Sequence, residues 1–284
     1  MLHRAHRGRH YAGPWAWTPP SGARLPGEPV LAGALRELKE EAGITSAEPV
    51  PVDLSGPWAS FLAEVPASTQ VRLDAEHGRF EWVPEAEALT RCRPASVAAS
   101  VAAAAAVPRH DVAFRPLTRA DLADMIEWQR TPHAARWFPG QLDLAAAGRK
   151  YGPRIDGYTP VRVHVVLVRG RPCGFIQHYP VADLAADGPS TAGLDFGIGI
   201  AGLTGTGLGP QLIWAYLAKV VAPRWPRLKT VVACPDARNT RSIRALAKAG
   251  FRPVSETVSA ASAKPERPEL LFALDRLHML GPAG

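Results

Sequence analysis

An alanine-rich segment that ends at a proline divides this chain into two regions with different sequence patterns. Residues 101–111 read VAAAAAVPRHD, and alanine favours a helix that Pro108 would end. At 284 residues the chain is long enough for two domains that each bury a core. We therefore expect one domain over 1–107, a linker over 108–112 and a second domain over 113–278.

The composition excludes several classes of protein. Hydrophobic residues make up 46% and charged residues 21% of the chain, as in folded globular proteins and unlike disordered ones. No apolar run reaches the ~18 residues of a membrane span, and the basic start has no apolar signal core behind it. Cys92, Cys173 and Cys234 are too few and too far apart for a disulfide framework. We expect a cytoplasmic protein that does not bind membranes.

The excess of positive charge lies entirely in the second region. Residues 1–110 hold 11 Lys and Arg against 12 Asp and Glu, whereas residues 111–284 hold 22 against 14. This excess fits either a solvated arginine-rich surface or a site for an anionic ligand such as a nucleotide. The basic residues are scattered and do not alternate with aromatic residues, so we do not expect nucleic acid as a partner.

The second region alternates between strand and helix patterns. We expect strands at 111–117, 161–168, 174–179, 193–200 and 230–234, and helices at 119–129, 209–221 and 240–249. A turn at 169–173 would join the second and third strands, and Gly250 suits the end of the last helix. The fold class expected from this alternation is α/β (α+β), with a mixed sheet.

In the first region, three carboxylates share one face of the strongest helix. Glu37, Glu40 and Glu41 follow a glycine-rich loop and are spaced i, i+3 and i+4. Such carboxylates repel one another unless a cation or an arginine lies among them, and Mg²⁺ favours oxygen ligands. The simpler alternative is a solvated acidic face.

The spacing of this stretch resembles the Nudix box. The matching positions are Gly22, Glu28, Arg36, Glu37, Leu38, Glu40, Glu41, Gly43 and Ile44. The resemblance covers about residues 1–107 and implies a Nudix α/β/α sandwich that hydrolyses a nucleoside diphosphate derivative with Mg²⁺ or Mn²⁺. It implies that Glu37, Glu40 and Glu41 hold the metal and that Glu28 pairs with Arg36 to fix the loop against the helix.

One departure affects this interpretation. Only 21 residues precede Gly22, so we expect a Nudix domain that lacks its first strand or strands, with residues 1–4 as the tail of a missing strand and an unpaired sheet edge. Glu76 and Glu81 are candidates for a further acidic group, or ordinary carboxylates at a strand edge. Two alternatives follow for this domain. It is a hydrolase, whose activity could be the main one of the chain, or it is an inactive regulatory module.

A glycine-rich loop opens a helix in the second region. Residues 195–209 read DFGIGIAGLTGTGLG and run directly into PQLIWAYLAKVV. Backbone N–H groups of such a loop and of the first helical turn favour a pyrophosphate, although a flexible turn is the alternative.

This loop resembles the coenzyme A loop of the GNAT acetyltransferases, with Thr204 in place of the usual Arg or Gln. Residues 239–251 (NTRSIRALAKAGF) resemble the ending of that family, and 110–275 as a whole most resembles the aminoglycoside 6′-N-acetyltransferase branch. The resemblance implies acetyl-CoA as cosubstrate and a small-molecule amine as acceptor. The implied acetyl-CoA contacts are Ile198, Gly199, Ile200, Thr204, Gly205, Thr206, Gly207, Leu208, Gly209 and Asn239.

Acetyl transfer to an amine needs a base, and Asp195 matches the family position for it; the alternative is that Asp195 only ends a strand. Two positions depart from the family. Leu246 stands where the family often has a Tyr that donates a proton to the leaving thiolate. Cys234 stands near the position at which the aminoglycoside enzymes carry a substrate-binding Asp. Other side chains could still form an acidic or aromatic acceptor site, although core packing is the alternative for the aromatic ones. They are Asp156, Asp183, Asp187, Asp236, Trp128, Trp137 and Tyr179.

Overall fold

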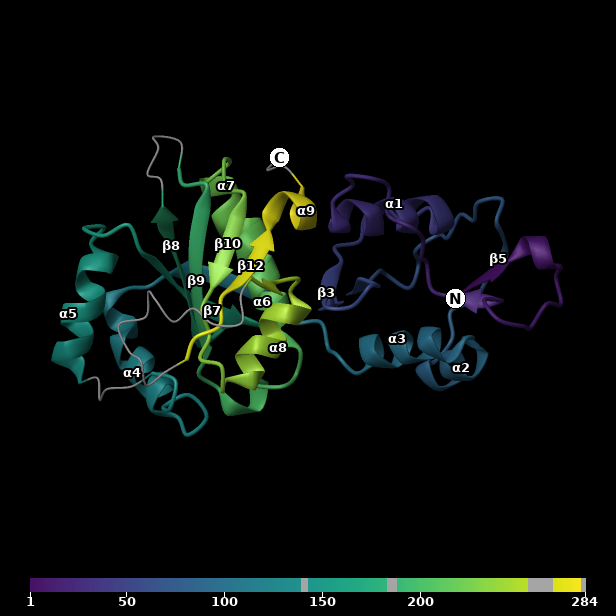
Figure 1. The fold of residues 1–284 in the computed structure, drawn as a ribbon. Helices are drawn as coiled ribbons and strands as arrows, with labels where there is room; N and C mark the ends of the chain where they lie inside the picture. Colours follow the sequence, from purple (N-terminus) through teal and green to yellow (C-terminus); the bar gives the residue numbers. More distant parts are fainter. Residues whose placement is uncertain (139–142, 183–187, 255–267, 282–284) are drawn as a thin grey trace. The chain divides into compact units, whose positions relative to one another are not determined.

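The computed structural model describes residues 1–138, 143–182, 188–254 and 268–281. These residues form two compact units (Figure 1): Met1–Arg109 together with Leu277–Gly281, and His110–Arg276. Residues 110–112, which the sequence places in a linker, belong to the second unit. Within the described ranges, no helix is long and apolar enough to cross a membrane.

Residues 1–109 of the first unit form two small antiparallel sheets and three α-helices. One sheet has the order β2-β1-β5, and the other is the pair β3-β4. The elements are β1 (Leu2–Arg4), η1 (Ala5–Arg7), β2 (Trp17–Thr18), α1 (Val30–Ala42), β3 (Val50–Asp53), β4 (Ser60–Leu62), β5 (His77–Phe80), α2 (Glu85–Arg91) and α3 (Ala95–Ala105). Residues 2–4, expected as the tail of a missing strand beside an unpaired edge, form the middle strand, with a partner on each side.

Helix α1 carries the box of carboxylates. Pro29 is extended at the N-cap of the helix, and Val30 is its first residue. At the other end Gly43 is left-handed, and its N–H donates to the carbonyls of Leu38 and Lys39. The helix ends against a small core of Ala42, Ile44 and Ala47.

The second unit is built on a seven-stranded sheet with the order β11-β12-β10-β9-β8-β7-β6. All neighbouring strands are antiparallel except β9 and β10, which are parallel. The strands are β6 (Val112–Pro116), β7 (Arg162–Val168), β8 (Arg171–Ala182), β9 (Thr191–Ile198), β10 (Thr230–Ala233), β11 (Arg252–Pro253) and β12 (Phe272–Asp275). The helices are η2 (Arg119–Asp121), α4 (Leu122–Arg130), α5 (Leu144–Ile155), η3 (Ala201–Leu203), α6 (Leu208–Tyr216), the π-helical turn η4 (Leu217–Val221), α7 (Ala222–Arg224) and α8 (Thr240–Lys248). Helix α9 (Arg276–Leu280) begins at Arg276 of this unit, and its residues from Leu277 belong to the first unit.

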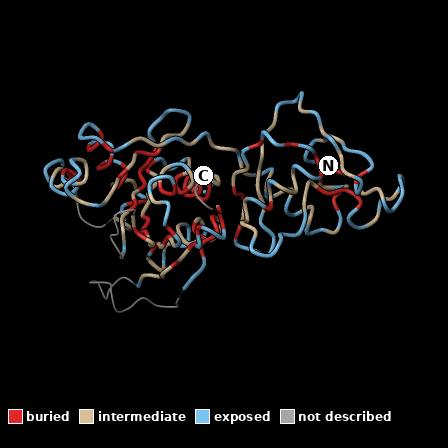
Figure 2. Tube along the Cα trace, turned by 90° about the horizontal axis from the view of Figure 1, so that it is seen from above, coloured by how far each residue is buried: buried red, intermediate tan, exposed pale blue. Residues whose placement is uncertain are grey.

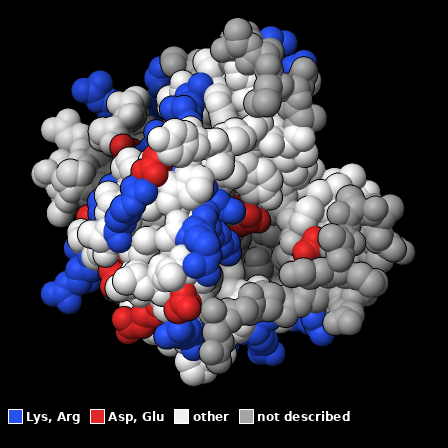
Figure 3. Space-filling model, turned by 90° about the vertical axis from the view of Figure 1, so that its left-hand side faces the viewer, with Lys and Arg blue, Asp and Glu red and all other residues white. Residues whose placement is uncertain are grey.

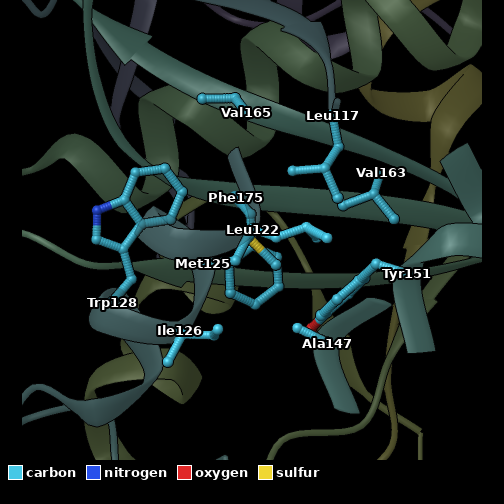
Figure 4. Close-up of a cluster of buried hydrophobic side chains, with 10 residues drawn as sticks. All are labelled: Leu117, Leu122, Met125, Ile126, Trp128, Ala147, Tyr151, Val163, Val165 and Phe175. Atoms are coloured by element: carbon cyan, nitrogen blue, oxygen red, sulfur yellow. The ribbon is translucent and has the colours of Figure 1, made fainter. Parts of the chain in front are cut away.

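Helices cover both faces of this sheet. Helices α4 and α5 pack on one face, where Met125 and Tyr151 meet Val163, Val165 and Phe175 (Figure 4). Helix α6 lies on the other face, where the Tyr216 hydroxyl bonds Nδ1 of His164 and of His178 at 2.8 and 2.6 Å. Figure 2 shows many buried residues along the sheet and helices of this unit. The side chains of each strand therefore alternate between two covered faces.

The strands and helices predicted for the second region are present, with shifted ends. The turn predicted over 169–173 is shorter: Arg169 and Gly170 both have positive φ, and β8 starts at Arg171. This is the geometry of a two-residue hairpin turn. The sequence analysis does not predict α5, β12 or α9, and α5 proves to carry groups that reach the site.

Candidate functional site

The parallel strands β9 and β10 pair over only part of their length. The pairing joins Thr191–Gly193 to Thr230–Val232, whereas β9 continues to Ile198. Beyond Gly193, β9 therefore keeps its partner β8 but has no paired strand on the β10 side within the described ranges. Asp195 lies on this open stretch, and the glycine-rich loop follows it.

Asp195 is held by a neutral amide. The Gln177 Nε2 donates to Asp195 Oδ2 at 2.7 Å, and Gln177 Oε1 in turn accepts from Arg154 Nη1 at 2.8 Å. Burial raises the pKa of Asp195 above its ordinary value, against the lowering effects of Gln177, Arg154 and Lys150. A carboxylate with a raised pKa in a partly open site is suited to exchange a proton with a ligand.

Tyr179 completes the wall beside Asp195. Its ring lies directly on Gly193, where an added Cβ would be 2.2 Å from Tyr179 Cε2, so only glycine fits at this position. The Tyr179 hydroxyl also hydrogen-bonds the Asp195 carboxyl, which lowers the pKa of Asp195 slightly against the larger effect of burial. Tyr179 therefore lies beside Asp195, on the same face of the sheet.

The glycine-rich loop ends at the start of α6. Gly205 and Gly207 have φ of +80° and +84°, and Gly207 is the N-cap residue, so Leu208 and Gly209 form the first turn of the helix. The hydroxyls of Thr204 and Thr206 donate back to the carbonyls of Ala201 and Leu203 at 2.8 and 2.9 Å. A pyrophosphate would thus be bound through backbone N–H groups at the helix start, where the helix dipole favours an anion.

His110 holds this loop from the start of the second unit. Its Nε2 lies 3.2 Å from both the carbonyl oxygen and Oγ1 of Thr206. Its backbone N–H donates to Oε1 of the buried Gln211 in α6 at 2.9 Å. The sequence analysis places His110 in a linker and misses this role, because no local pattern connects residues 96 positions apart.

The residues between Asp195 and the loop differ in what their backbone can offer. Gly199 donates its N–H to the carbonyl of Cys173 at 2.8 Å. The Ile198 carbonyl lies 2.8 Å from His133 Nε2. Of the expected acetyl-CoA contacts Ile198, Gly199 and Ile200, Gly199 therefore has its N–H engaged within the sheet in this arrangement and does not offer it to an acyl group.

Helix α8 places two further residues named by the resemblance. Asn239 is its N-cap, and the Asn239 Oδ1 accepts from the Ser242 N–H at 3.2 Å, so only the NH₂ group of this amide is left for a ligand. Leu246 is fully buried and offers no proton to a leaving group.

The remaining candidates are mostly occupied by other contacts. Trp128 is buried in the core between α4 and the sheet, and Trp137 lies under the Arg136 guanidinium. Asp156 pairs with Arg119, which lowers its pKa. Asp183 and Asp187 lie outside the described residues.

Asp236 is also paired, since Arg238 donates to both of its carboxylate oxygens at 2.9 and 2.7 Å.

Figure 3 shows the side of this unit that carries α4 and α5, where Lys and Arg side chains are spread out with Asp and Glu beside some of them. The scattered pattern fits the solvated arginine-rich surface that the sequence allows.

In the first unit, an arginine lies among the carboxylates of α1. Arg36 donates to Glu28 at 2.9 and 3.0 Å, to Glu37 at 2.8 Å and to Glu40 at 2.9 Å. This bond network lowers the pKa of Glu28. An added Cβ at Gly22 would lie 2.1 Å from the Glu37 carboxyl carbon, so a side chain there would displace this carboxylate.

Glu41 points elsewhere and is buried. Its Oε2 accepts from the Ser21 N–H at 2.7 Å, and its Oε1 lies 3.8 Å from Nε2 of the buried His77. His77 Nδ1 is bonded to Asp74 at 2.8 Å, and burial raises the pKa of Glu41. Asp74 and His77 are thus the neighbours of this carboxylate that the sequence analysis misses.

The two acidic candidates named from the sequence lie apart from Glu41. Glu76 is exposed, and Glu81 pairs with Arg91. Throughout the described part of the chain, no three His, Cys, Asp or Glu side chains form a group able to hold a metal ion. As arranged, Glu37, Glu40 and Glu41 do not fit one metal, because Arg36 binds the first two and the third is turned toward Ser21 and His77.

Comparisons with known proteins agree with this division. Residues 118–258 match the model of the GNAT acetyltransferase domain, and residues 1–105 match that of the NUDIX domain. A crystal structure of aminoglycoside acetyltransferase AAC(6')-Ib with coenzyme A is 27% identical, with a TM-score of 0.51, over 59% of this chain and 96% of that chain. The complex of AAC(6')-Ib with coenzyme A and kanamycin gives the same values. The complex with paromomycin and acetyl-CoA is 27% identical over 59% and 94%, with a TM-score of 0.50.

Proposed function

Since this chain joins a Nudix domain to a GNAT acetyltransferase domain, we propose that its second unit transfers an acetyl group from acetyl-CoA to a small-molecule amine, with Asp195 as the base. The observation that carries the proposal is the position of Asp195. It is a desolvated carboxylate on the open edge of β9, and the same strand leads into the glycine loop at the start of α6.

Asp195 performs the proton transfer in this mechanism. Acetyl-CoA, when bound, supplies the acetyl group as an activated thioester. The ammonium of the acceptor gives a proton to Asp195, directly or through one water, and the free amine then attacks the carbonyl carbon. The N–C bond forms and the C–S bond breaks, so the sulfur leaves as a thiolate. The second proton that the nitrogen loses on becoming an amide passes to that thiolate or to solvent. Leu246 cannot donate a proton to the leaving sulfur, as the Tyr often found at this family position does. Transfer can proceed without that proton, because a thiolate is a stable leaving group.

The glycine loop supports the second half of the proposal. Thr204, Gly205, Thr206, Gly207, Leu208 and Gly209 would hold the pyrophosphate of acetyl-CoA, with His110 fixing the loop. The Asn239 NH₂ group and the backbone of Ile198 and Ile200 would contact the pantetheine arm and the acyl group. Gly205 and Gly207 in the left-handed region let successive N–H groups point the same way.

The acceptor is proposed only as a class. The structural relatives bind kanamycin and paromomycin, which are polycationic amines. In this chain Cys234 replaces an acidic residue of that branch, and the second region carries an excess of positive charge. Both features weaken the case for an aminoglycoside, so we propose the acceptor as a small-molecule amine, aminoglycoside-like or other.

The first unit is a candidate for a second activity, the hydrolysis of a nucleoside diphosphate derivative with Mg²⁺ or Mn²⁺. Glu37, Glu40 and Glu41 would carry it. The bonds from Arg36 to Glu37 and Glu40 favour the alternative, a module that packs or binds a nucleotide without hydrolysing it. Incubating the full chain with Mg²⁺ and a panel of nucleoside diphosphate derivatives separates the two, since only a hydrolase releases products.

Calorimetric titration with acetyl-CoA tests the main proposal. Gly207→Val should abolish binding, because a branched side chain is strained at this φ and blocks the approach to the loop backbone. Gly148→Val on α5 is the matched control, since nothing lies within 4 Å of an added Cβ there. Unchanged affinity in a folded Gly207→Val protein would remove the coenzyme from this loop, and the proposed function with it.

A further inference from the structure

Gln177 and Asp195 are placed opposite each other by the sheet. The antiparallel pairing of β8 with β9 sets Gln177 directly across from Asp195. On its other side β8 pairs with β7, where Val163 is the partner of Gln177. Side chains of directly opposite residues are neighbours on one face of a sheet, so the backbone fixes the position from which the Gln177 side chain reaches Asp195.

The register does not fix which end of the Gln177 amide meets Asp195. The amide has a donor NH₂ group and an acceptor oxygen of similar shape, and the last torsion of a glutamine side chain allows two opposite orientations. A hydrogen bond to an ionised carboxylate forms only when the NH₂ group faces it, because a carboxylate can only accept. In the other orientation the amide oxygen would face the carboxylate and repel it.

Arg154 decides between these two orientations. Its Nη1 donates to Gln177 Oε1 at 2.8 Å, and Gln177 Nε2 donates to Asp195 Oδ2 at 2.7 Å. A guanidinium has no acceptor, so it can bond only the oxygen end of the amide. The bond from Arg154 therefore holds the NH₂ group on the side of Asp195.

Helix α5 in turn gives Arg154 a defined position. Arg154 is half-buried in the last turn of the helix, and its guanidinium carbon lies 5.3 Å from the centre of the Tyr151 ring. Tyr151 is buried in the core (Figure 4), where its hydroxyl accepts from Gln129 Nε2 at 3.0 Å. A cation over an aromatic face is attracted to the ring. The donor that orients Gln177 is thus anchored on a packed aromatic side chain.

Lys150, on the same helix, allows charge and orientation to be separated. It is exposed, and its Nζ lies 5.1 Å from the centre of the Tyr151 ring. Burial raises the pKa of Asp195, and the charges of Arg154 and Lys150 both act against that rise. Arg154 also donates to Gln177, so a comparison of the two residues distinguishes an effect of charge from an effect on the amide.

We propose that Arg154 is a positioning residue for the acetyl transfer, because it holds the Gln177 amide in the orientation in which Asp195 acts as a base. This inference rests on the proposed function. Without Arg154 the amide can turn its oxygen toward Asp195, an arrangement that is favourable only when the carboxyl group holds a proton. A protonated Asp195 cannot take a proton from the acceptor ammonium, so transfer is lost over the pH range in which the carboxyl stays protonated.

The test follows the acidic limb of the pH–rate profile of the full chain, with whichever of kanamycin, glucosamine and hexylamine the parent acetylates fastest. Arg154→Met keeps a long side chain and removes the donor. The limb should move to higher pH by roughly one to two units, with a loss of rate on the limb of about 10- to 100-fold. Arg154→Lys keeps a charged donor and should restore part of the parental limb.

Lys150→Met is the matched control for the loss of a charge from α5. It should move the limb far less than Arg154→Met does, because an exposed charge is screened by solvent.

A second background isolates the effect of orientation. Gln177→Ala has no amide to orient, so Arg154→Met should shift the limb much less in that background than in the parent. An equal shift in both backgrounds would mean that Arg154 acts through its charge alone and would overturn the proposal.

NMR titration of the aspartate carboxyl carbons gives a readout that does not depend on turnover, with the Asp195 signal assigned from Asp195→Asn. A higher pKa of Asp195 in Arg154→Met than in the parent is expected. If the parent transfers acetyl groups but Arg154→Met leaves the limb and this titration unchanged, the role of Arg154 is refuted and the proposed function stands. If the parent binds acetyl-CoA yet acetylates no amine, the proposed function itself fails, and the role of Arg154 fails with it.

Discussion

In the first unit the carboxylates of α1 surround an arginine, whereas in the second unit Asp195 meets a neutral amide. Arg36 bonds Glu28, Glu37 and Glu40, and it lowers the pKa of Glu28. Asp195 accepts from Gln177, and burial raises its pKa. The pKa of Glu28 is therefore lowered in the first unit, whereas the pKa of Asp195 is raised in the second.

This difference separates a satisfied site from a reactive one. A carboxylate paired with a fixed guanidinium stays ionised and has little to offer a ligand. A carboxylate that is desolvated and held only by an amide costs stability, but it readily takes a proton or binds a cation. Glu41 is intermediate, because it is buried beside His77 and accepts a backbone N–H from Ser21.

The largest expected effect follows from removing the charge of Asp195. In Asp195→Asn, acetyl transfer should fall by roughly 10²–10⁴-fold, the usual contribution of a general base. Acetyl-CoA affinity should stay at the parental value, because the pyrophosphate loop is separate from this carboxylate. Steady-state rates with a saturating amine, together with calorimetry of acetyl-CoA, measure both quantities.

Glu37→Gln in the first unit is the matched control for that experiment. It removes one carboxylate that is already paired with Arg36, and it should leave the transfer rate unchanged. If Asp195→Asn transfers acetyl groups at the parental rate, Asp195 has only a structural role. The two units would then not differ in carrying a reactive carboxylate.

The parts of the molecule that sequence predicts well depend on local backbone requirements. The glycine loop and the start of α6 are predictable because Gly205 and Gly207 have positive φ, a conformation that glycine adopts more readily than other residues. Helix α1 is predictable because its cap and its spacing are local. The pairing of Glu28 with Arg36 is implied by the resemblance and is present in the structure.

The parts that sequence misses depend on distant contacts or on conflicting local signals. Helix α5 contains Gly152 and Pro153, which hide a helix that Asp143 caps by accepting from the Ala146 N–H. Arg154, the partner of Gln177, lies on α5 and is therefore missed together with this helix. The bonds of Arg36 to Glu37 and Glu40 need a rotamer that spacing alone does not specify.

Replacing the arginine in the first unit should have the next largest effect. Arg36→Gln leaves three neighbouring carboxylates without their cation, so the melting temperature of the first unit should fall. Mg²⁺ should then raise it, whereas the parent should respond little to Mg²⁺ because Arg36 already supplies the positive charge. Thermal unfolding of both proteins with and without Mg²⁺ measures the difference, and Arg79→Gln serves as a control arginine on β5.

A strong rise in the melting temperature of the parent with Mg²⁺ would contradict this expectation. It would show that the carboxylates exchange Arg36 for a metal and would favour the hydrolase over the inactive module.

In the second unit, removing the charge of Asp195 should raise the stability, whereas removing the charge of Arg36 should lower that of the first unit. The pKa of Asp195 in the folded protein lies above its ordinary value of 3.8, so the folded state holds the proton more tightly than the unfolded state does. Stability therefore falls as the pH rises through that raised pKa and stays lower at neutral pH. Asp195→Asn should raise the melting temperature of the second unit by a few degrees at pH ~7, with a gain that shrinks as the pH is lowered. A lower melting temperature at every pH would mean that Asp195 stabilises the fold.

The smallest expected effect concerns how Gln177 holds Asp195. The hydrogen bond from Gln177 favours the ionised carboxylate, so Gln177→Ala should raise the pKa of Asp195 further. Because the base must be ionised to act, the acidic limb of the pH–rate profile should move to higher pH by about one unit, the equivalent of ~1.4 kcal/mol. Transfer should fall several-fold on that limb and approach the parental rate above it. Gln129→Ala, which breaks a bond to the Tyr151 hydroxyl in the neighbouring core, is the control for a loss of packing and should lower the rate equally at all pH values. An equal loss at all pH values in Gln177→Ala would instead mean that Gln177 positions Asp195 without tuning its proton affinity.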